Sequence, residues 1–200
     1  MLIANLAACI KPNGQLLLVG ENKAGIKSAA KLLEPIASQV NKIDSARHCS
    51  LFCAHVDEHV ATFDIAKWQD GWTVETNDTS LSLVSLPGVF SHKELDEGTK
   101  LLLENVSKVP SGRVLDFACG AGVIGCYLAQ KNPGIDLVMS DVSALALHCA
   151  KESAKLNNIE ADVVASDGLN EISGSFAGIY TNPPFHTGIQ TDYSITQRFI

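Results

Sequence analysis

From residue 112 onward, short apolar runs alternate with stretches in which apolar residues recur at helical spacing. The apolar runs predict strands, and the spaced stretches predict helices. The expected strands cover residues 113–117, 136–140, 161–165 and 177–181, and the expected helices cover residues 122–130 and 144–156. Strands that alternate with helices predict a parallel, doubly wound α/β sheet that binds ligands at the carboxyl ends of its strands.

The pattern upstream of this region is less regular. Residues 72–76 and 81–85 alternate as strands around a turn-forming tetrapeptide, which predicts a hairpin, and residues 95–106 have helical spacing. Before them we expect helices at 2–10 and 24–33 and strands at 15–19 and 50–56, with the apolar run 15–19 suited to a buried parallel strand. This first part has α/β organisation but begins in the middle of a sheet. We therefore expect a partial domain in residues 1–66 and a second domain in residues 67–200.

Composition narrows the class of protein. The chain is 46% hydrophobic and 18% charged, which is enough apolar material for a core, and no apolar run approaches the roughly 20 residues that cross a bilayer. Six cysteines without an export signal favour reduced thiols in the cytoplasm. The net charge of −7 is unusual for a nucleic-acid-binding protein. Residues 1–70 are electrically balanced, however, so the acidity lies in the second part of the chain.

A glycine-containing turn follows the first predicted strand of the regular region. Asp116 lies near the end of that strand, and the turn into the next helix contains Ala118, Cys119, Gly120 and Gly122. Glycine lets a backbone approach a ligand closely, and the helix N-terminus offers free N–H groups. Gly-x-Gly also occurs in dinucleotide sites and in plain turns. The preceding acid favours a ligand with an ammonium group over a pyrophosphate.

Acidic residues also follow the next two predicted strands. Asp141 lies 21 residues after Gly120, a spacing typical of a carboxylate that binds ribose hydroxyls; the alternative is that it caps the next helix. Asp167 and Gly168 follow the third strand. They are equally suited to contact an adenine amino group or to form an ordinary turn.

The most specific pattern is Thr181-Asn182-Pro183-Pro184-Phe185-His186, directly after the last predicted strand. The two prolines fix the backbone, so neighbouring carbonyl groups are held in place. The Asn182 amide oxygen and the Pro183 carbonyl could accept hydrogen bonds from an exocyclic amino group. Phe185 offers a flat face on which a base can stack, worth about 1–3 kcal/mol in nucleic-acid complexes. The simpler alternative is a rigid turn at the end of a strand.

These segments together resemble a known family. Asn-Pro-Pro-Phe at 182–185 looks like motif IV of amino-methyltransferases, residues 116–122 look like motif I, Asp141 looks like motif II and Asp167 looks like motif III. The ribosomal RNA guanine-N2 methyltransferases of the RsmC type are similar in further segments. These are residues 19–25, 42–47, 86–91, 95–96, 98 and 188–191. The resemblance thus extends over nearly the whole chain.

The resemblance implies a Rossmann-like, S-adenosylmethionine (SAM)-dependent methyltransferase domain preceded by a degenerate methyltransferase-like domain that helps to hold RNA. The chain would be an internal fragment, with the catalytic sheet incomplete at its C-terminus. The residues implied to bind SAM are Asp116, Ala118, Cys119, Gly120, Gly122, Asp141, Asp167, Gly168 and Asn182. Those implied to hold the guanine are Asn182, Pro183, Pro184 and Phe185. Further substrate candidates are Phe90 and His186. Ala118 departs from the family, which usually has glycine there. The implied reaction is direct methyl transfer to guanine N2 of small-subunit ribosomal RNA in the 30S subunit, without a metal.

Several alternatives stay open. The same tetrapeptide occurs in adenine-N6 and protein glutamine-N5 methyltransferases, although those favour tyrosine in place of Phe185. A non-catalytic RNA-binding or assembly module, or an NAD-dependent oxidoreductase, are other classes. Cys49, Cys53, His55 and His59 suggest zinc, but they lack a Cys-x-x-Cys pair. Lys23, Lys27 and Lys31 would share one helical face, which is either solvated or in contact with phosphate.

Overall fold

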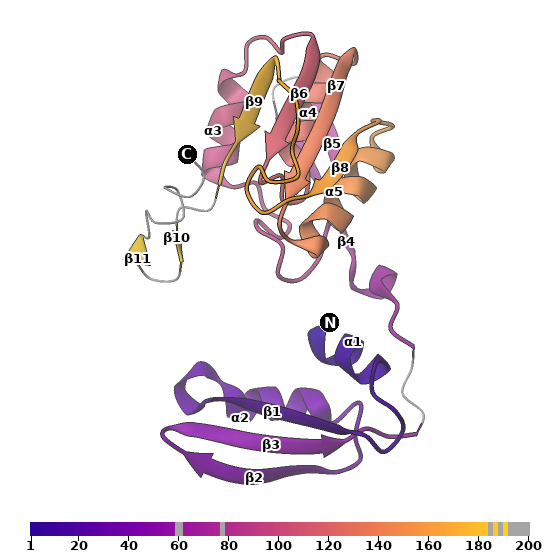
Figure 1. Ribbon diagram of the computed structural model, residues 1–200, viewed down its shortest axis with the longest axis vertical. Coiled ribbons are helices and arrows are strands. Elements are labelled where there is room, and N and C mark those ends of the chain that lie inside the picture. The colour runs from indigo at the N-terminus through magenta and orange to yellow at the C-terminus, as the bar shows by residue number, and fades with distance from the viewer. Residues whose placement is uncertain (59–61, 77–78, 184–185, 188–189, 192–200) are drawn as a thin grey trace. The chain divides into compact units, whose positions relative to one another are not determined.

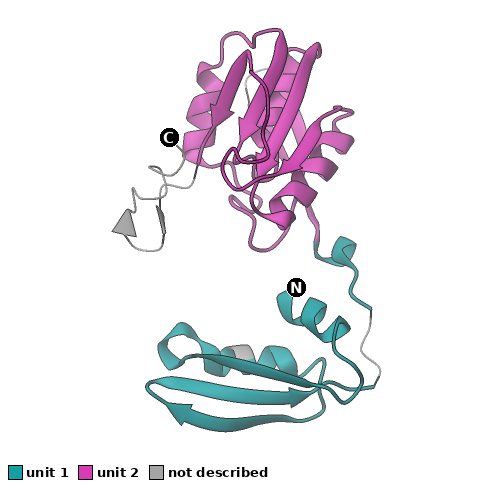
Figure 2. Ribbon diagram, viewed as in Figure 1, with its two compact units in different colours: residues 1–68 teal, residues 69–200 magenta. Residues whose placement is uncertain are grey.

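The computed structural model describes residues 1–58, 62–76, 79–183, 186–187 and 190–191 (Figure 1). The chain divides into two compact units, Met1–Trp68 and Gln69–Ile200 (Figure 2). Each unit has its own sheet. Within the described residues, no helix is long and apolar enough to cross a membrane.

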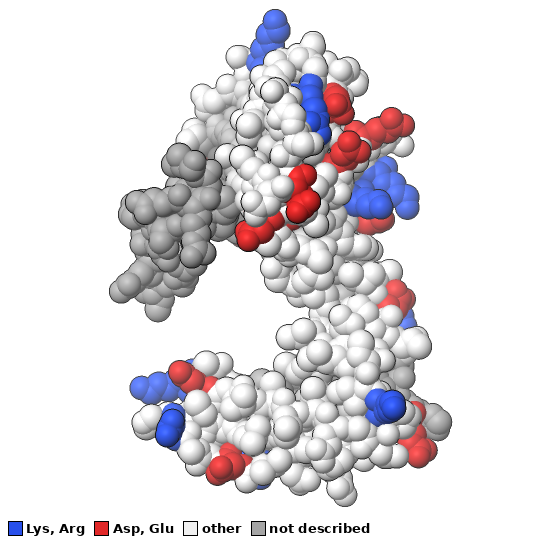
Figure 3. Space-filling view, viewed as in Figure 1, with Lys and Arg blue, Asp and Glu red and all other residues white. Residues whose placement is uncertain are grey.

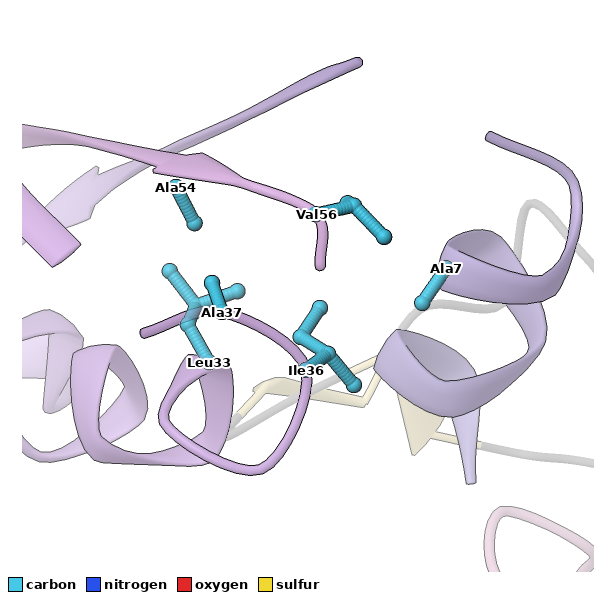
Figure 4. Packing of buried hydrophobic residues seen from close by; sticks show 6 residues of the cluster. All are labelled: Ala7, Leu33, Ile36, Ala37, Ala54 and Val56. Atoms are coloured by element: carbon cyan, nitrogen blue, oxygen red, sulfur yellow. The ribbon is translucent and has the colours of Figure 1, made fainter. Parts of the chain in front are cut away.

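Unit 1 is a three-stranded antiparallel sheet with short helices on one face. Its elements are α1 (Leu2–Ala8), β1 (Gln15–Glu21), η1 (Asn22–Ala24), α2 (Ile26–Ala29), η2 (Ala30–Leu33), β2 (Val40–Ala46), β3 (Cys49–His55) and η3 (Ile65–Trp68). The strand order is β1-β3-β2. Figure 4 shows its core, in which Ala7 of α1 and Leu33, Ile36 and Ala37 face Ala54 and Val56 at the end of β3.

Three expectations for unit 1 were wrong or incomplete. The apolar run 15–19 forms a strand, but β1 pairs antiparallel with β3, so its alternate residues are exposed instead of buried on both faces. β2 was not expected, because its residues are mostly exposed and do not alternate between apolar and polar. The expected helix 24–33 is broken, since Gly25 adopts a left-handed conformation with φ of 88°. Lys23 therefore lies outside the helix that carries Lys27, and the three lysines do not share one regular helical face.

Unit 2 contains the doubly wound sheet that the sequence predicts, and the prediction of this fold class is confirmed. The elements before the sheet are β4 (Asp70–Thr76), β5 (Thr79–Ser85) and α3 (Glu97–Asn105). The alternating part is β6 (Gly112–Phe117), α4 (Val123–Lys131), β7 (Ile135–Asp141), α5 (Ala144–Leu156), β8 (Asp162–Ala165) and β9 (Gly178–Thr181). Two short strands follow, β10 (His186–Thr187) and β11 (Gln190–Thr191).

The four central strands are all parallel, in the order β8-β7-β6-β9. Chain order reverses at β6, because β7 and β8 extend the sheet on one side and β9 on the other (Figure 1). The core is built from apolar residues of β6 and β7, such as Val114, Leu115 and Leu137, together with the nearly wholly buried α4. β4 and β5 form the expected antiparallel hairpin. This arrangement brings the carboxyl ends of β6, β7 and β9 to one edge, where sheets of this kind bind ligands.

Candidate functional site

A cavity of about 280 Å³ lies at the carboxyl ends of the parallel strands. Four segments and one side chain line it: residues in 88–99, the turn and first residues of α4 in 117–124, residues in 141–146 after β7, residues 166–168 after β8, and Asn182 after β9. The register explains why they meet, since Phe117 pairs with Ser140 on one side and with Thr181 on the other. The sheet thus collects the predicted motifs around one space.

The turn after β6 is built from left-handed backbone conformations. Ala118, Gly120 and Gly122 have φ of 57°, 53° and 79°. Backbone hydrogen bonds hold the turn, with the Cys119 N–H donating to the Ser140 carbonyl at 2.9 Å and the Gly122 N–H donating to the Cys119 carbonyl at 2.8 Å. A side chain at Gly120 would meet no atom within 4 Å, so the backbone there is open to a ligand. Ala118, Cys119 and Gly120 line the cavity, whereas Gly122 begins α4 and lies against Ala150.

Asp116 belongs to β6 and is not among the cavity-lining residues. Its side chain is fully buried, and its Oδ2 accepts a hydrogen bond from the Gly125 N–H at 2.8 Å. Its Oδ1 has no partner among the described residues. Burial raises the pKa of Asp116 to about 7, and the charge of Asp141 adds to this effect. Asp116 therefore joins β6 to the first turn of α4, and its expected contact with the cofactor stays a prediction.

Asp141 lines the cavity at the end of β7. Its Oδ2 accepts a hydrogen bond from the Gly120 N–H at 3.0 Å, and its Oδ1 accepts one from the Ser143 N–H at 2.8 Å. The cap of α5 is Ser143, whose Oγ accepts from the Ala146 N–H, so the alternative that Asp141 caps this helix is wrong. Each carboxylate oxygen has a second lone pair available, so both oxygens can still accept hydroxyl groups.

Asp167 and Gly168 form the expected turn, and the contact with adenine stays a prediction. Both line the cavity, and they also form a turn in which Ser166 Oγ donates to the Gly168 carbonyl at 2.8 Å. Gly168 has φ of 62°, and a side chain there would meet no atom within 4 Å. The turn therefore presents Asp167 and an open backbone to the cavity.

Asn182 is the part of the Asn-Pro-Pro-Phe segment that the structure places on the cavity. Its amide nitrogen donates to Asp96 Oδ2 at 2.7 Å and to Thr99 Oγ1 at 3.0 Å. Pro183 follows at partial burial and is not among the lining residues. Pro184, Phe185 and the side chain of His186 lie outside the described residues. Phe90 lines the same cavity and is 58% exposed, as expected for a residue at its mouth.

Sequence reasoning missed the roles of Asp96 and Thr99. Asp96 caps α3 by accepting from the Thr99 N–H at 3.0 Å, and both residues line the cavity. The cap could have been found, because an acid before a helical stretch is a usual start signal. The contact with Asn182 could not, because it spans 83 and 86 residues along the chain.

The cysteines of unit 2 have no features of a nucleophile. Burial raises the pKa of Cys119 well above its usual value, raises that of Cys126 to about 12 and raises that of Cys149 to about 11. These thiols are therefore protonated at neutral pH, and the reactive form is the thiolate. Among the described residues, no group of three or more metal-binding side chains is present.

Comparison with known proteins gives consistent matches. The family model described as methyltransferase small domain matches residues 80–200, and the one described as methyltransferase small domain N-terminal matches residues 1–72. The chain is similar to "Ribosomal RNA small subunit methyltransferase C" of Pseudoalteromonas atlantica, with 62% identity over 200 residues, and to the protein of the same description from Psychromonas ingrahamii, with 44% identity over 199 residues. It covers 58% and 57% of these proteins, and thus spans somewhat more than half of their length.

Among solved structures, the chain resembles that of T. thermophilus 16S rRNA N2 G1207 methyltransferase (RsmC), described as a complex with AdoMet and guanosine. The TM-score is 0.85 at 21% sequence identity, and the match covers 98% of this chain and 54% of the other. At this identity the likeness establishes the fold of both units.

Proposed function

Because this chain belongs to the methyltransferase small domain family, we propose that its protein transfers a methyl group from SAM to the exocyclic N2 of a guanine in small-subunit ribosomal RNA. The observation that carries the proposal is the position of Asn182. It lines the same cavity as the glycine turn, Asp141 and Asp167. One space thus has room for a donor nucleoside and an acceptor for an amino group.

The residues present fit SAM. The cavity of about 280 Å³ is close to the lower end of the range of about 300–1,000 Å³ for small-molecule sites. We assign Asp141 to the two ribose hydroxyls, since it lines the cavity and each of its oxygens retains a lone pair. Asp167 and the open backbone at Gly168 suit the adenine, and the open backbone at Gly120 suits the methionine part. Ala118 and Cys119 complete this wall. We also assign Asp116 and Gly122 to the donor site, where Asp116 holds the start of α4 through the Gly125 N–H.

SAM bound here would supply a methyl group attached to a positively charged sulfur, and the neutral thioether that remains is a good leaving group. The chain's own residues contribute position and acceptor atoms. Asn182 Oδ1 and the Pro183 carbonyl would accept hydrogen bonds from the two N2 hydrogens and so orient the nitrogen lone pair toward the methyl carbon. The new N–C bond would replace the donor's C–S bond, and one of the two N2 protons would be lost to solvent. Holding donor and acceptor about 3 Å apart can account for many orders of magnitude in rate.

The choice of small-subunit ribosomal RNA rests on the similar proteins of P. atlantica and P. ingrahamii, which are named ribosomal RNA small subunit methyltransferases. The choice of guanine N2 rests on the similar T. thermophilus protein, named a 16S rRNA N2 G1207 methyltransferase and solved with guanosine. We assign Phe185 to stacking on the base, and Phe90 and His186 to its surroundings. We assign residues 1–66 to a degenerate methyltransferase-like domain that holds RNA, and Lys23, Lys27 and Lys31 to phosphate contacts. Free thiols agree with a cytoplasmic location, where 30S subunits are found.

The full-length protein tests this function directly. It is incubated with labelled SAM and, in parallel, 30S subunits, protein-free 16S ribosomal RNA, and a mixture of ribosomal proteins, and the methylated product is identified by mass. We expect N2-methylguanosine from a ribosomal RNA substrate. N6-methyladenosine or methylated glutamine would instead assign the chain to another amino-methyltransferase class. No binding of SAM in calorimetry would favour a non-catalytic RNA-binding module.

A further inference from the structure

The Asn182 side chain is held by two residues of the segment that begins α3. Its Nδ2 lies 2.7 Å from Asp96 Oδ2 and 3.0 Å from Thr99 Oγ1. A primary amide nitrogen has two hydrogens, so these two acceptors use both of them. Within the described residues, Asn182 Oδ1 accepts no hydrogen bond, although the side chain lines the cavity.

The chemistry of Asp96 fixes which way the amide faces. A carboxylate can only accept hydrogen bonds, so the atom of Asn182 next to it must be the nitrogen and not the oxygen. The same carboxylate oxygen also accepts from the Thr99 N–H at 3.0 Å, which holds Asp96 in its rotamer at the start of α3. A charge-assisted hydrogen bond of this kind is stronger than one between neutral groups.

Gly98 makes the close approach possible. A Cβ atom at this position would lie 3.0 Å from Asn182 Oδ1, 3.0 Å from Asp96 Oδ2 and 3.2 Å from Asn182 Nδ2. Thr99 is buried, with 7% of its surface exposed, so its hydroxyl is not free to turn away to solvent. The segment 96–99 therefore packs closely against the side-chain amide of Asn182.

We infer that Asp96 and Thr99 are positioning residues that bind both amide hydrogens of Asn182 and thereby leave its Oδ1 as the acceptor for the amino group of the target base. This inference rests on the proposed function. A freely rotating asparagine would present its NH₂ group in part of the molecules, and that group repels an incoming amine. Donation from Nδ2 to a carboxylate also polarises the amide, which makes Oδ1 a better acceptor.

The test uses four variants of the full-length protein. Asp96→Ser keeps a good helix cap but is too short to hold Asn182, and Thr99→Val removes only the hydroxyl at nearly the same shape. Thr99→Ser is the conservative variant that keeps the hydroxyl. Ser153→Ala is the matched control, because it removes a buried hydrogen bond, from the Val84 N–H to Ser153 Oγ at 3.0 Å, away from the cavity lining.

Single-turnover methyl transfer and the Kd for SAM are measured for each protein. We expect the transfer rate to fall about 10- to 100-fold in Asp96→Ser and about 10-fold in Thr99→Val, with the Kd for SAM changed less than twofold. Thr99→Ser should recover most of the rate, and Ser153→Ala should lower the melting temperature without lowering the rate. Unchanged transfer rates in Asp96→Ser and Thr99→Val would overturn the inference. So would a loss of transfer rate that weaker SAM binding explains.

A second measurement does not depend on activity. With ¹⁵N-labelled asparagine, the side-chain amide protons of Asn182 should exchange with solvent much more slowly than those of the exposed Asn158, and Asp96→Ser and Thr99→Val should abolish the difference. Fast exchange in the unaltered protein would show that Asp96 and Thr99 do not hold the amide hydrogens of Asn182, and would overturn the inference. Slow exchange in a protein that methylates nothing would instead overturn the proposed function, and the acceptor role of Oδ1 with it.

Discussion

Asp116 shows how one buried carboxyl group makes the stability of the fold depend on pH. Its pKa is raised from 3.8 to about 7, mainly by burial, so in the folded protein it keeps its proton over a range in which the unfolded chain loses it. Between about pH 4 and pH 7 the folded state therefore binds more protons than the unfolded state, and the free energy of unfolding falls as pH rises. Above about pH 7 this contribution becomes constant.

Asp116→Asn should remove this dependence. We expect the difference in free energy of unfolding between pH 5 and pH 8 to shrink by a few kcal/mol relative to the unaltered protein, as urea denaturation measures it. Asp162→Asn, which alters an exposed carboxyl group of β8, should leave the difference as it is. Identical pH profiles for the unaltered protein and Asp116→Asn would contradict the burial argument.

Ala118 occupies a backbone position that suits glycine better. Its φ of 57° is left-handed, which costs an ordinary residue roughly 1–2 kcal/mol, while glycine loses about 0.5–1 kcal/mol more conformational entropy on folding. Ala118→Gly should therefore stabilise the protein by about 0.5–1 kcal/mol in thermal denaturation.

The opposite substitution at a neighbouring left-handed position, Gly122→Ala, serves as the control for Ala118→Gly. At Gly122, φ is 79° and a Cβ would lie 3.1 Å from Ala150 Cα, so Gly122→Ala combines backbone strain with a steric conflict and should destabilise by more than about 2 kcal/mol. A lower melting temperature for Ala118→Gly would mean that the alanine side chain is needed for packing.

The site residues differ in how far the sequence reveals them. Asn182, Asp141 and Asp167 follow strands at recognisable spacings, so their positions at one sheet edge could be predicted. Asp116 was expected to contact the ligand. Its full burial and its hydrogen bond with the Gly125 N–H could not be predicted, because no sequence spacing indicates them. The same holds for the contact of Asp96 with Asn182.

At the scale of elements, the alternating part of unit 2 was predictable because buried parallel strands are continuous apolar runs. Helix α5 was predicted with the bounds that it has, because its apolar residues recur at helical spacing. Its cap was not predicted: Asp141 was the candidate, and Ser143 is the cap. β1 and β2 were harder, because the apolar run of β1 has the composition of a parallel strand and β2 has little apolar signal at all. Their pairing depends on β3, so it is decided by tertiary contacts.

Two side chains join the hairpin of β4 and β5 to the α5 region: Ser153 of α5, which accepts from the Val84 N–H, and Asn157, which follows α5. Asn157 Nδ2 donates to the Ser82 carbonyl at 2.7 Å, and its Oδ1 accepts from the Ser82 N–H at 3.1 Å. Asn157→Ala should lower the free energy of unfolding by about 1–3 kcal/mol, measured by urea denaturation. Asn105→Ala loses only a bond within its own exposed helix turn and should change it by less than about 0.5 kcal/mol. Equal effects would contradict a fastening role for Asn157.

At the scale of the whole molecule, the basic side chains do not form one large positive patch on the face that Figure 3 shows. In the face that Figure 3 shows, Lys and Arg side chains are separated by acidic and uncharged ones. The net charge of this chain is −7, so its two units offer no general positive charge to RNA. The contribution proposed for unit 1 is therefore local, through the phosphate contacts of its lysines.

Replacing Lys23, Lys27 and Lys31 by glutamine tests those contacts. In the full-length protein we expect weaker binding to 16S ribosomal RNA, and a salt dependence of log K reduced in slope by about 2–3, because up to three counterions are no longer released. The exposed Lys100, Lys108 and Lys151 of unit 2, replaced in the same way, provide a control of equal charge. An unchanged slope in the first variant would assign these lysines to a solvated surface.

The most direct test of the account is the separation of donor binding from methyl transfer at Asn182. In the full-length protein, Asn182→Ala should bind SAM with a Kd within about threefold of the unaltered protein, while methyl transfer to ribosomal RNA falls by at least about 100-fold, since the acceptor of the target amine is lost. Transfer at the unaltered rate would contradict the central claim that Asn182 presents the amino group to the donor.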